Sequence, residues 1–189
     1  MDWRLPRLVG VLSPTCLARS RRFPRFAFRS YTHQMQYSFM ARAIELAIEN
    51  ARSGYGGPFG AVIVKDGAII AEGANSVTAT NDPTAHAEIV AIRAACAKLG
   101  VFQLNGLDLY ASCEPCPMCL AAIYWARPAR VYFAGSAADA SRVGFDDSFI
   151  YQELPLPLQQ RRIPMVQTMR EEALEAFRVW EQNPDKLRY

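Results

Sequence analysis

The sequence predicts an α/β domain in which one mixed sheet carries helices on both faces. Three observations indicate this class: four segments with helical spacing of apolar residues, short apolar runs of strand length between them, and alternation of the two after an initial hairpin. The chain has 189 residues, about half of them apolar, which suits one domain with a sizeable core. No apolar run approaches the roughly 18 residues that a membrane-spanning helix needs.

The N-terminal half of the domain is expected to form a helix followed by a hairpin. Apolar residues recur at helical spacing over residues 37–54, and a glycine ends this segment. Two short strands are then expected at 61–64 and 68–72, joined by a turn at 65–67 that contains Asp-Gly.

The remainder of the chain alternates between helices and strands. Helices are predicted at 83–100 and 115–128, and strands at 107–112 and 129–135. Residues 163–168 could form a fifth strand. The last helix is predicted at 170–183, where the following proline ends it.

The first 35 residues differ in composition from the rest. Residues 1–35 hold seven arginines and a single acidic residue, which is typical of an organellar transit peptide. A start codon assigned too far upstream explains the same pattern, with Met35 or Met40 near the true start. On either interpretation we expect a disordered extension before a domain at 36–189. That domain keeps 14 basic and 17 acidic residues, a net charge of −3. It therefore lacks the excess of positive charge that is typical of proteins that bind nucleic acid.

Three of the five cysteines lie close together, at Cys113, Cys116 and Cys119. An odd, clustered set indicates metal binding or reactive thiols in a reducing compartment, and so favours a cytoplasmic location. Cys116 and Cys119 stand three residues apart at a predicted helix start, so both sulfurs can reach one ion. A helix N-terminus also favours the thiolate form.

His86 opens the preceding predicted helix. Two helix starts of one α/β sheet can lie side by side, so His86 can supply a third ligand to the same ion. Three protein ligands with a fourth position open are typical of catalytic zinc, which lowers the pKa of its bound water to about 7. Glu88 is then placed to take the proton of that water and pass it to a leaving group.

A closed structural zinc site is the alternative. In that site Cys113 would be a fourth ligand, and Glu88 would be an ordinary acidic residue at a helix start. Cys113 falls on the strand side of the turn, so its sulfur is not expected to share the face of the other two. Cys96, near the end of the same helix as His86, is expected to lie in the core.

The motif His-x-Glu followed by Pro-Cys-x-x-Cys resembles the signature of zinc-dependent nucleobase deaminases. The longer strings GGPFGAVIVKDG, NDPTAHAE, SCEPCPMCL, AIYWARP and GFDDSFIY resemble bacterial guanine deaminases of the cytidine/deoxycytidylate deaminase-like zinc superfamily. The resemblance runs from about Met40 to Tyr189. It implies a cytidine-deaminase-like three-layer α/β/α sandwich with a central mixed sheet, and the hydrolysis of guanine to xanthine and ammonia.

The resemblance also implies roles for individual residues beyond the zinc ligands His86, Cys116 and Cys119. Substrate contacts are implied for Asn75, Phe59 and Ala87. Asp147 would contact the ring-nitrogen side and assist proton transfer. From the residues alone, Asn75 could instead cap the hairpin, Phe59 could be a core residue, and Asp147 could cap a helix.

The C-terminus has an implied role in a homodimer. Tyr189 would reach the active site of a partner subunit through an exchanged C-terminal segment. Without the resemblance, a frayed tail is the simpler expectation. The apolar residues of the last predicted helix nevertheless require a surface to cover them.

The implied reaction is hydrolytic deamination. Glu88 deprotonates the zinc-bound water, hydroxide attacks the amine-bearing carbon C2, and Glu88 with Asp147 protonates the ring nitrogen and the departing ammonia. Guanosine deaminase and tRNA adenosine deaminase are the nearest alternatives, and the second needs a basic surface. Cytidine or deoxycytidylate deamination fits the purine-type strings less well. A non-catalytic, zinc-stabilised interaction domain is the alternative of a different class.

Overall fold

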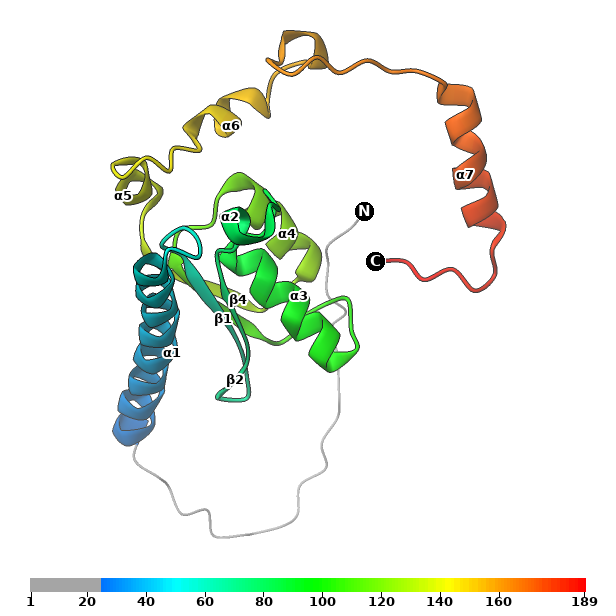
Figure 1. Ribbon diagram of the computed structural model, residues 1–189. Helices are drawn as coiled ribbons and strands as arrows, with labels where there is room; N and C mark the ends of the chain where they lie inside the picture. The colour runs from blue at the N-terminus through cyan, green and yellow to red at the C-terminus, as the bar shows by residue number, and fades with distance from the viewer. Residues whose placement is uncertain (1–24) are drawn as a thin grey trace, which may run out of the picture.

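The structure, a computed structural model, describes residues 25–189, with side chains described from residue 34 onward. Its centre is a four-stranded sheet in the order β2-β1-β3-β4 (Figure 1). The strands are β1 (Gly60–Lys65), β2 (Ala68–Ala74), β3 (Asp108–Cys113) and β4 (Arg130–Gly135). Strand β1 pairs antiparallel with β2 and β3, whereas β3 and β4 are parallel. The predicted mixed sheet is therefore confirmed.

Helices cover both faces of this sheet. Helix α1 (Arg25–Ser53) packs on one face, and α3 (Ala87–Leu99) with α4 (Pro117–Ala126) packs on the other (Figure 1). Successive side chains of β1 point to opposite faces. Ala61 and Ile63 join the core beneath α3 and α4, while Val62 and Val64 join the core beneath α1. The predicted α/β/α sandwich is confirmed.

Helix α1 begins earlier than the sequence pattern predicted. The start was expected at residue 37, but the helix extends back to Arg25, so the predicted domain boundary at residue 35 falls inside it. No proline or glycine occurs between Pro24 and Gly54, so no residue in this segment stops a helix. The expectation of disorder is wrong for residues 25–35, and residues 1–24 lie outside the described part. The division into an extension and a domain stays a prediction.

The β1–β2 hairpin has the turn that its sequence predicted. Asp66 and Gly67 both have positive φ, 49° and 78°. This pair of values is typical of the type I′ turn, whose twist matches that of the flanking strands.

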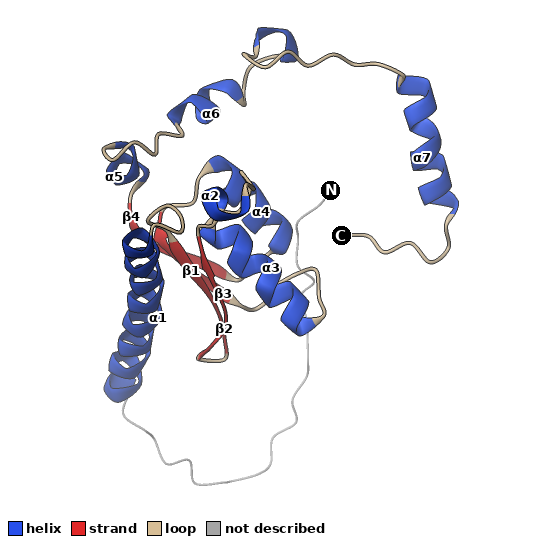
Figure 2. Cartoon of the chain, viewed as in Figure 1, coloured by secondary structure: helices blue, strands red, loops and turns tan. Residues whose placement is uncertain are grey.

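The other predicted helices and strands are present, with ends shifted by a few residues, apart from the fifth strand. Residues 163–168 have no regular secondary structure, so that prediction is wrong. A strand needs a hydrogen-bonding partner, and this segment lies away from the sheet (Figure 2). Sequence reasoning also missed four short elements: α2 (Val77–Thr80), α5 (Ala137–Ser141), α6 (Ser148–Glu153) and η1 (Leu158–Gln160). Among the described residues, no helix is both long and apolar enough to cross a membrane.

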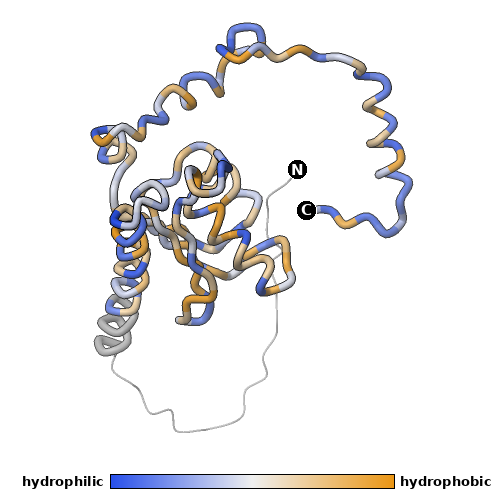
Figure 3. Tube along the Cα trace, in the orientation of Figure 1, coloured by the Kyte–Doolittle hydropathy of each residue, from blue (hydrophilic) through white to orange (hydrophobic). Residues whose placement is uncertain are grey.

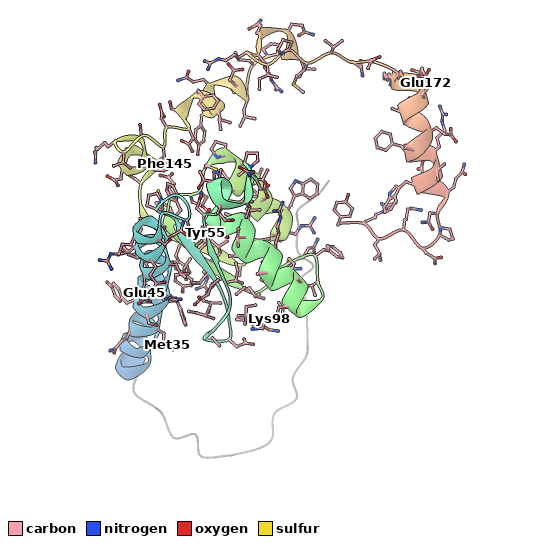
Figure 4. The ribbon with its side chains drawn as sticks, viewed as in Figure 1. Met35, Glu45, Tyr55, Lys98, Phe145 and Glu172 are labelled. Carbon is pink, nitrogen blue, oxygen red and sulfur yellow. The ribbon has the colours of Figure 1, made fainter. Side chains whose placement is uncertain are left out.

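Residues 136–189, here called the C-terminal arm, leave the sheet after β4. The arm carries α5, α6, η1 and finally α7 (Arg170–Gln182), which stands apart from the sandwich (Figures 1 and 2). Glu172, near the start of α7, lies well away from the sandwich (Figure 4). Apolar residues recur along α7 (Figure 3), yet none of its residues is buried, and Phe177 is 68% exposed. The chain therefore presents an apolar helix face that its own sandwich does not cover.

Candidate active site

The two helix starts predicted to carry the metal ligands lie together. His86 is the N-cap residue of α3, and Cys116 is the N-cap residue of α4. Both have extended backbone, with ψ of 155° and 167°, as N-cap residues usually do. Helix α4 follows β3 by a short turn, so the site forms at the carboxyl end of the parallel strand pair. Ligands in open α/β sheets commonly bind at this edge.

One nitrogen and two sulfurs form a compact donor set. The side chains of His86, Cys116 and Cys119 offer ligand atoms that all lie within 4.8 Å of one another. Nδ1 of His86 is 3.5 Å from each of the two sulfurs. A tetrahedral zinc with Zn–S near 2.3 Å and Zn–N near 2.0–2.1 Å would separate these atoms by about 3.6 Å. The donor set therefore fits zinc in both chemistry and spacing.

The electrostatics of the two cysteines also suit a metal. Hydrogen bonds from Cys119 and His86 lower the pKa of Cys116 to about 4, so this sulfur is a thiolate at neutral pH. The pKa of Cys119 is raised, because its thiol donates to that thiolate and is buried. Two adjacent thiolates need a cation beside them, and zinc binding deprotonates such thiols.

Cys113 does not join this donor set. Its sulfur lies 3.5 Å from the carbonyl oxygen of Ser136, at the root of the C-terminal arm. Among the described residues, the groups that could hold a metal comprise three ligands, as the open-site interpretation expects. Cys96 is half-buried and packs against the core, as predicted.

Glu88 lies in the first turn of α3, beside the ligands. It is only 8% exposed, and its Oε2 is 3.5 Å from the sulfur of Cys119. Burial raises the pKa of this carboxyl, and the Cys116 charge adds to the effect. A buried carboxyl with a raised pKa can both accept and donate a proton near neutral pH.

A cavity of about 610 Å³ opens in front of these residues. His86, Glu88 and Cys116 form its floor. The loop after α1, the end of β2 and the C-terminal arm supply the walls. The lining includes Asn75, Phe59 and Asp147, three of the residues implied to contact substrate.

Asn75 is held by the backbone so that its amide nitrogen remains available. Asn75 directly follows β2 and is only 6% exposed. Its Oδ1 accepts hydrogen bonds from the backbone N–H groups of Gly57, at 3.2 Å, and Val77, at 3.3 Å. Nδ2 of Asn50 on α1 donates to the carbonyls of both Gly57 and Asn75, which joins the two segments. Within the described part of the chain, the Nδ2 of Asn75 donates no hydrogen bond, and the residue lines the cavity.

Two aromatic rings form another wall of the cavity. Phe59 packs edge-on against Phe145, with ring centroids 4.9 Å apart and an interplanar angle of 86°. Phe145 comes from the C-terminal arm (Figure 4), and sequence reasoning missed it although it begins the FDDSF string. Phe59 also packs against the core, so its ring lies between the core and the cavity, and a contact with substrate stays a prediction.

The two adjacent aspartates before α6 have different environments. Asp146 accepts a hydrogen bond from the N–H of Ser148 at 3.0 Å and so caps the helix start. Asp147 makes no side-chain cap, and both aspartates line the cavity. Burial raises the pKa of Asp147, and the charges of Cys116, Asp146 and Glu114 raise it further.

Two implied contact residues lie elsewhere. Ala87, the first residue of α3, has its side chain buried in the core and does not line the cavity. The ring of Tyr189 lies against Phe102 and Trp125 of its own chain, with centroids 6.3 and 6.0 Å away, outside the cavity. Tyr189 therefore does not line the cavity of its own chain.

Comparison with known proteins supports this arrangement. Residues 33–135 match the family described as the cytidine and deoxycytidylate deaminase zinc-binding region. The chain is 57% identical over 152 residues to the guanine deaminase of Bacillus subtilis, which spans 80% of this chain and 97% of that protein. An X-ray structure of B. subtilis guanine deaminase has a TM-score of 0.79 over 81% of this chain and 98% of that chain, at 57% identity.

Two further similarities are less extensive. A tRNA-specific adenosine deaminase of Agrobacterium fabrum is 50% identical over 93 residues, which is 48% of this chain and 61% of that protein. A structure of guanine deaminase from Nitrosomonas europaea has a TM-score of 0.57 at 28% identity, over 78% of this chain and 83% of that chain. With the zinc-ligand motif, the fold and this extent of identity in common, the chain belongs to the cytidine and deoxycytidylate deaminase family of zinc-binding proteins.

Proposed function

We propose that the protein is a zinc-dependent guanine deaminase, which hydrolyses guanine to xanthine and ammonia. The observation that carries this proposal is the cavity itself. It combines a buried carboxyl, a zinc donor set, and two polar side chains that line a space large enough for a purine. The 57% identity to B. subtilis guanine deaminase supports the same substrate.

Glu88 is the proton shuttle of the proposed reaction. Zinc, when held by His86, Cys116 and Cys119, lowers the pKa of a bound water to about 7 and so supplies a nucleophile at neutral pH. Glu88 takes the proton released as the C2–O bond forms. It then gives a proton to the amine as the C2–N bond breaks, so that water and guanine become xanthine and ammonia. Its burial and raised pKa suit both halves of this transfer.

Asn75 and Asp147 orient the purine. Because the Oδ1 of Asn75 accepts from two backbone N–H groups, its Nδ2 presents hydrogen-bond donors to the cavity. Such donors fit the ring-nitrogen and carbonyl acceptors of guanine. Asp147 can accept from an N–H of the base and return that proton, and Phe59 offers an apolar wall to the purine. Ala87 would contribute through its backbone only.

The active form in this proposal is a homodimer with an exchanged C-terminal segment, which comprises α7 and the residues after it. Helix α7 stands away from the sandwich, and its Phe177 and Trp180 are exposed. Tyr189 lies outside the cavity of its own chain, so its proposed contact with the purine comes from a partner. Exchange of an identical segment gives a closed, symmetric dimer, and the covering segment would exclude water from the reaction. A cytoplasmic location is proposed because the zinc-binding thiols require a reducing compartment.

Guanosine is the second candidate substrate. A cavity of about 610 Å³ lies within the range of pockets that hold drug-sized ligands, so a ribose could fit beside the base in the uncovered site. A tRNA substrate is disfavoured, because residues 36–189 carry a net charge of −3.

A substrate panel with ammonia detection tests the proposal. The purified zinc-loaded enzyme is assayed with guanine, guanosine, adenine, cytidine, cytosine and a tRNA anticodon stem-loop. We expect guanine to give the highest kcat/KM. A higher value for guanosine would change the substrate, and activity on the stem-loop alone would overturn the proposal.

A further inference from the structure

Glu114 is a carboxylate in the cavity wall that has no part in the proposed chemistry. It follows the end of β3 and comes two residues before Cys116. Its Oε2 accepts a hydrogen bond from the backbone N–H of Ala137 at 3.0 Å. Its own backbone N–H donates to the carbonyl of Gly135 at 2.8 Å. Glu114 is therefore bonded at two points to the segment where β4 ends and the C-terminal arm begins.

The root of the arm is compact around this contact. Ser136 and Asp139 form a reciprocal capping box at the start of α5. Cys113, the neighbour of Glu114, places its sulfur 3.5 Å from the carbonyl oxygen of Ser136. Two consecutive residues of the zinc-binding turn thus hold the first residues of the arm.

Phe145 and Asp147, two of the cavity-lining residues of the arm, lie a short distance beyond this root. Phe145 is tied back to α5 by a hydrogen bond from its N–H to the carbonyl of Ala140, at 3.1 Å. Asp147 follows two residues later, and Ala137 and Ala140 line the same cavity. A shift of Ala137 would therefore displace Phe145 and Asp147 together, relative to the zinc ligands.

We propose that Glu114 is a positioning residue, which sets the place of Asp147 and Phe145 by holding the N–H of Ala137. This inference rests on guanine deamination as the proposed function. Glu114 acts here as a hydrogen-bond acceptor, and its charge is the smallest of the causes that raise the pKa of Asp147. A glutamine side chain, whose Oε1 can accept the same bond, should then replace it, whereas alanine should not.

The first test compares Glu114→Ala with Glu114→Gln. We expect kcat/KM for guanine to fall about 10–100-fold in Glu114→Ala, because misplacement of about 1 Å costs on the order of 10²-fold. Glu114→Gln should stay within about 3-fold of wild type. Glu153→Ala is the matched control, because Glu153 also accepts from a backbone N–H, that of Arg162 at 2.7 Å, but does not line the cavity.

A second variant removes the same hydrogen bond from the donor side. Ala137 is the first residue of α5, where proline is tolerated, and Ser136 before it already has the extended backbone that proline requires. Ala137→Pro should therefore reproduce the loss seen in Glu114→Ala while leaving Glu114 intact. Added to Asp147→Ala, the Glu114→Ala change should cost less than about 3-fold more, because both act through the same residue.

Hydrogen exchange provides a readout that does not depend on activity. In Glu114→Ala, amides of residues 137–147 should exchange faster, while those around His86 keep their protection and zinc content is unchanged. The proposal is overturned if Glu114→Gln loses as much activity as Glu114→Ala, if the loss adds fully to that of Asp147→Ala, or if Glu114→Ala loses zinc. Full activity in Glu114→Ala also overturns it. Absence of guanine turnover in wild type would instead refute the proposed function.

Discussion

Replacement of Asn75 separates substrate recognition from support of the backbone, provided that two variants are compared. Asn75→Asp keeps an oxygen that can accept from Gly57 and Val77, and it replaces the Nδ2 donors by a second oxygen. Asn75→Ala removes both functions. The aspartate variant therefore changes the face that Asn75 presents to the cavity, while most of its local contacts remain.

The magnitudes follow from the contacts. A site built to donate hydrogen bonds to a base loses on the order of 10²-fold or more in kcat/KM when its donors are lost. Both variants should show this loss. Asn75→Ala additionally leaves two part-buried N–H groups without an acceptor. At about 0.5–1.5 kcal/mol for each bond, this destabilises the fold by about 1–3 kcal/mol, or a Tm lower by roughly 3–10 °C.

Steady-state guanine deamination, zinc content and thermal unfolding are measured on wild type and both variants. We expect Asn75→Asp to keep its zinc and to unfold close to the wild-type Tm, with activity strongly reduced. If Asn75→Asp retains near-native kcat/KM, Asn75 does not donate to the base, and its role is only that of a local cap.

Four further outcomes test other parts of the molecule. Glu88→Ala should lose turnover and keep zinc, whereas a non-catalytic zinc domain would be unaffected. Cys113→Ser should keep its zinc by metal analysis, and near-complete loss would favour the closed four-ligand site. Arg42 lowers the pKa of Glu72 through a paired hydrogen bond, so this pair stabilises the fold above the unfolded-state pKa near 4.5 and less as pH falls through the folded-state pKa. Because both groups are partly exposed, Glu72→Gln should cost less than about 1 kcal/mol at pH 7 in chemical denaturation, and nothing well below pH 4. Deletion of residues 185–189 should sharply reduce guanine turnover at unchanged zinc content, and a fully active truncated enzyme or monomer would refute the exchanged dimer.

The zinc ligands could be predicted from sequence because their geometry is local. Cys116 and Cys119 are separated by one turn of a helix, and His86 begins another helix. The periodic apolar pattern located both helix starts. Strands β2 and β3 are both antiparallel to β1 and so run in the same direction, which brings the helices that follow them to one edge of the sheet. Short-range spacing therefore determined this half of the site.

The opposite wall of the cavity depends on contacts between distant segments. Asn50 and Glu114 act on backbone groups, the carbonyls of Gly57 and Asn75 and the N–H of Ala137. A backbone partner has no side-chain signature, so no residue pattern reveals these contacts. The pattern could show that polar residues were available, but only the folded chain shows which backbone groups they bind.

The C-terminal arm shows a different limit of sequence reasoning. Helix α7 has 13 residues and was predicted from the helical spacing of its apolar residues. That spacing can be recognised in the sequence without knowing what packs against the helix. An isolated helix of this length is marginal in water, and most helical stability in proteins comes from burial of an apolar face. No residue of α7 is buried by its own chain, so a second chain that covered its apolar face would stabilise the helix. The amphipathic pattern therefore specifies the helix but not the surface that covers it. In the proposed homodimer, an exchanged C-terminal segment would supply that surface and bring Tyr189 to the partner's cavity in the same step.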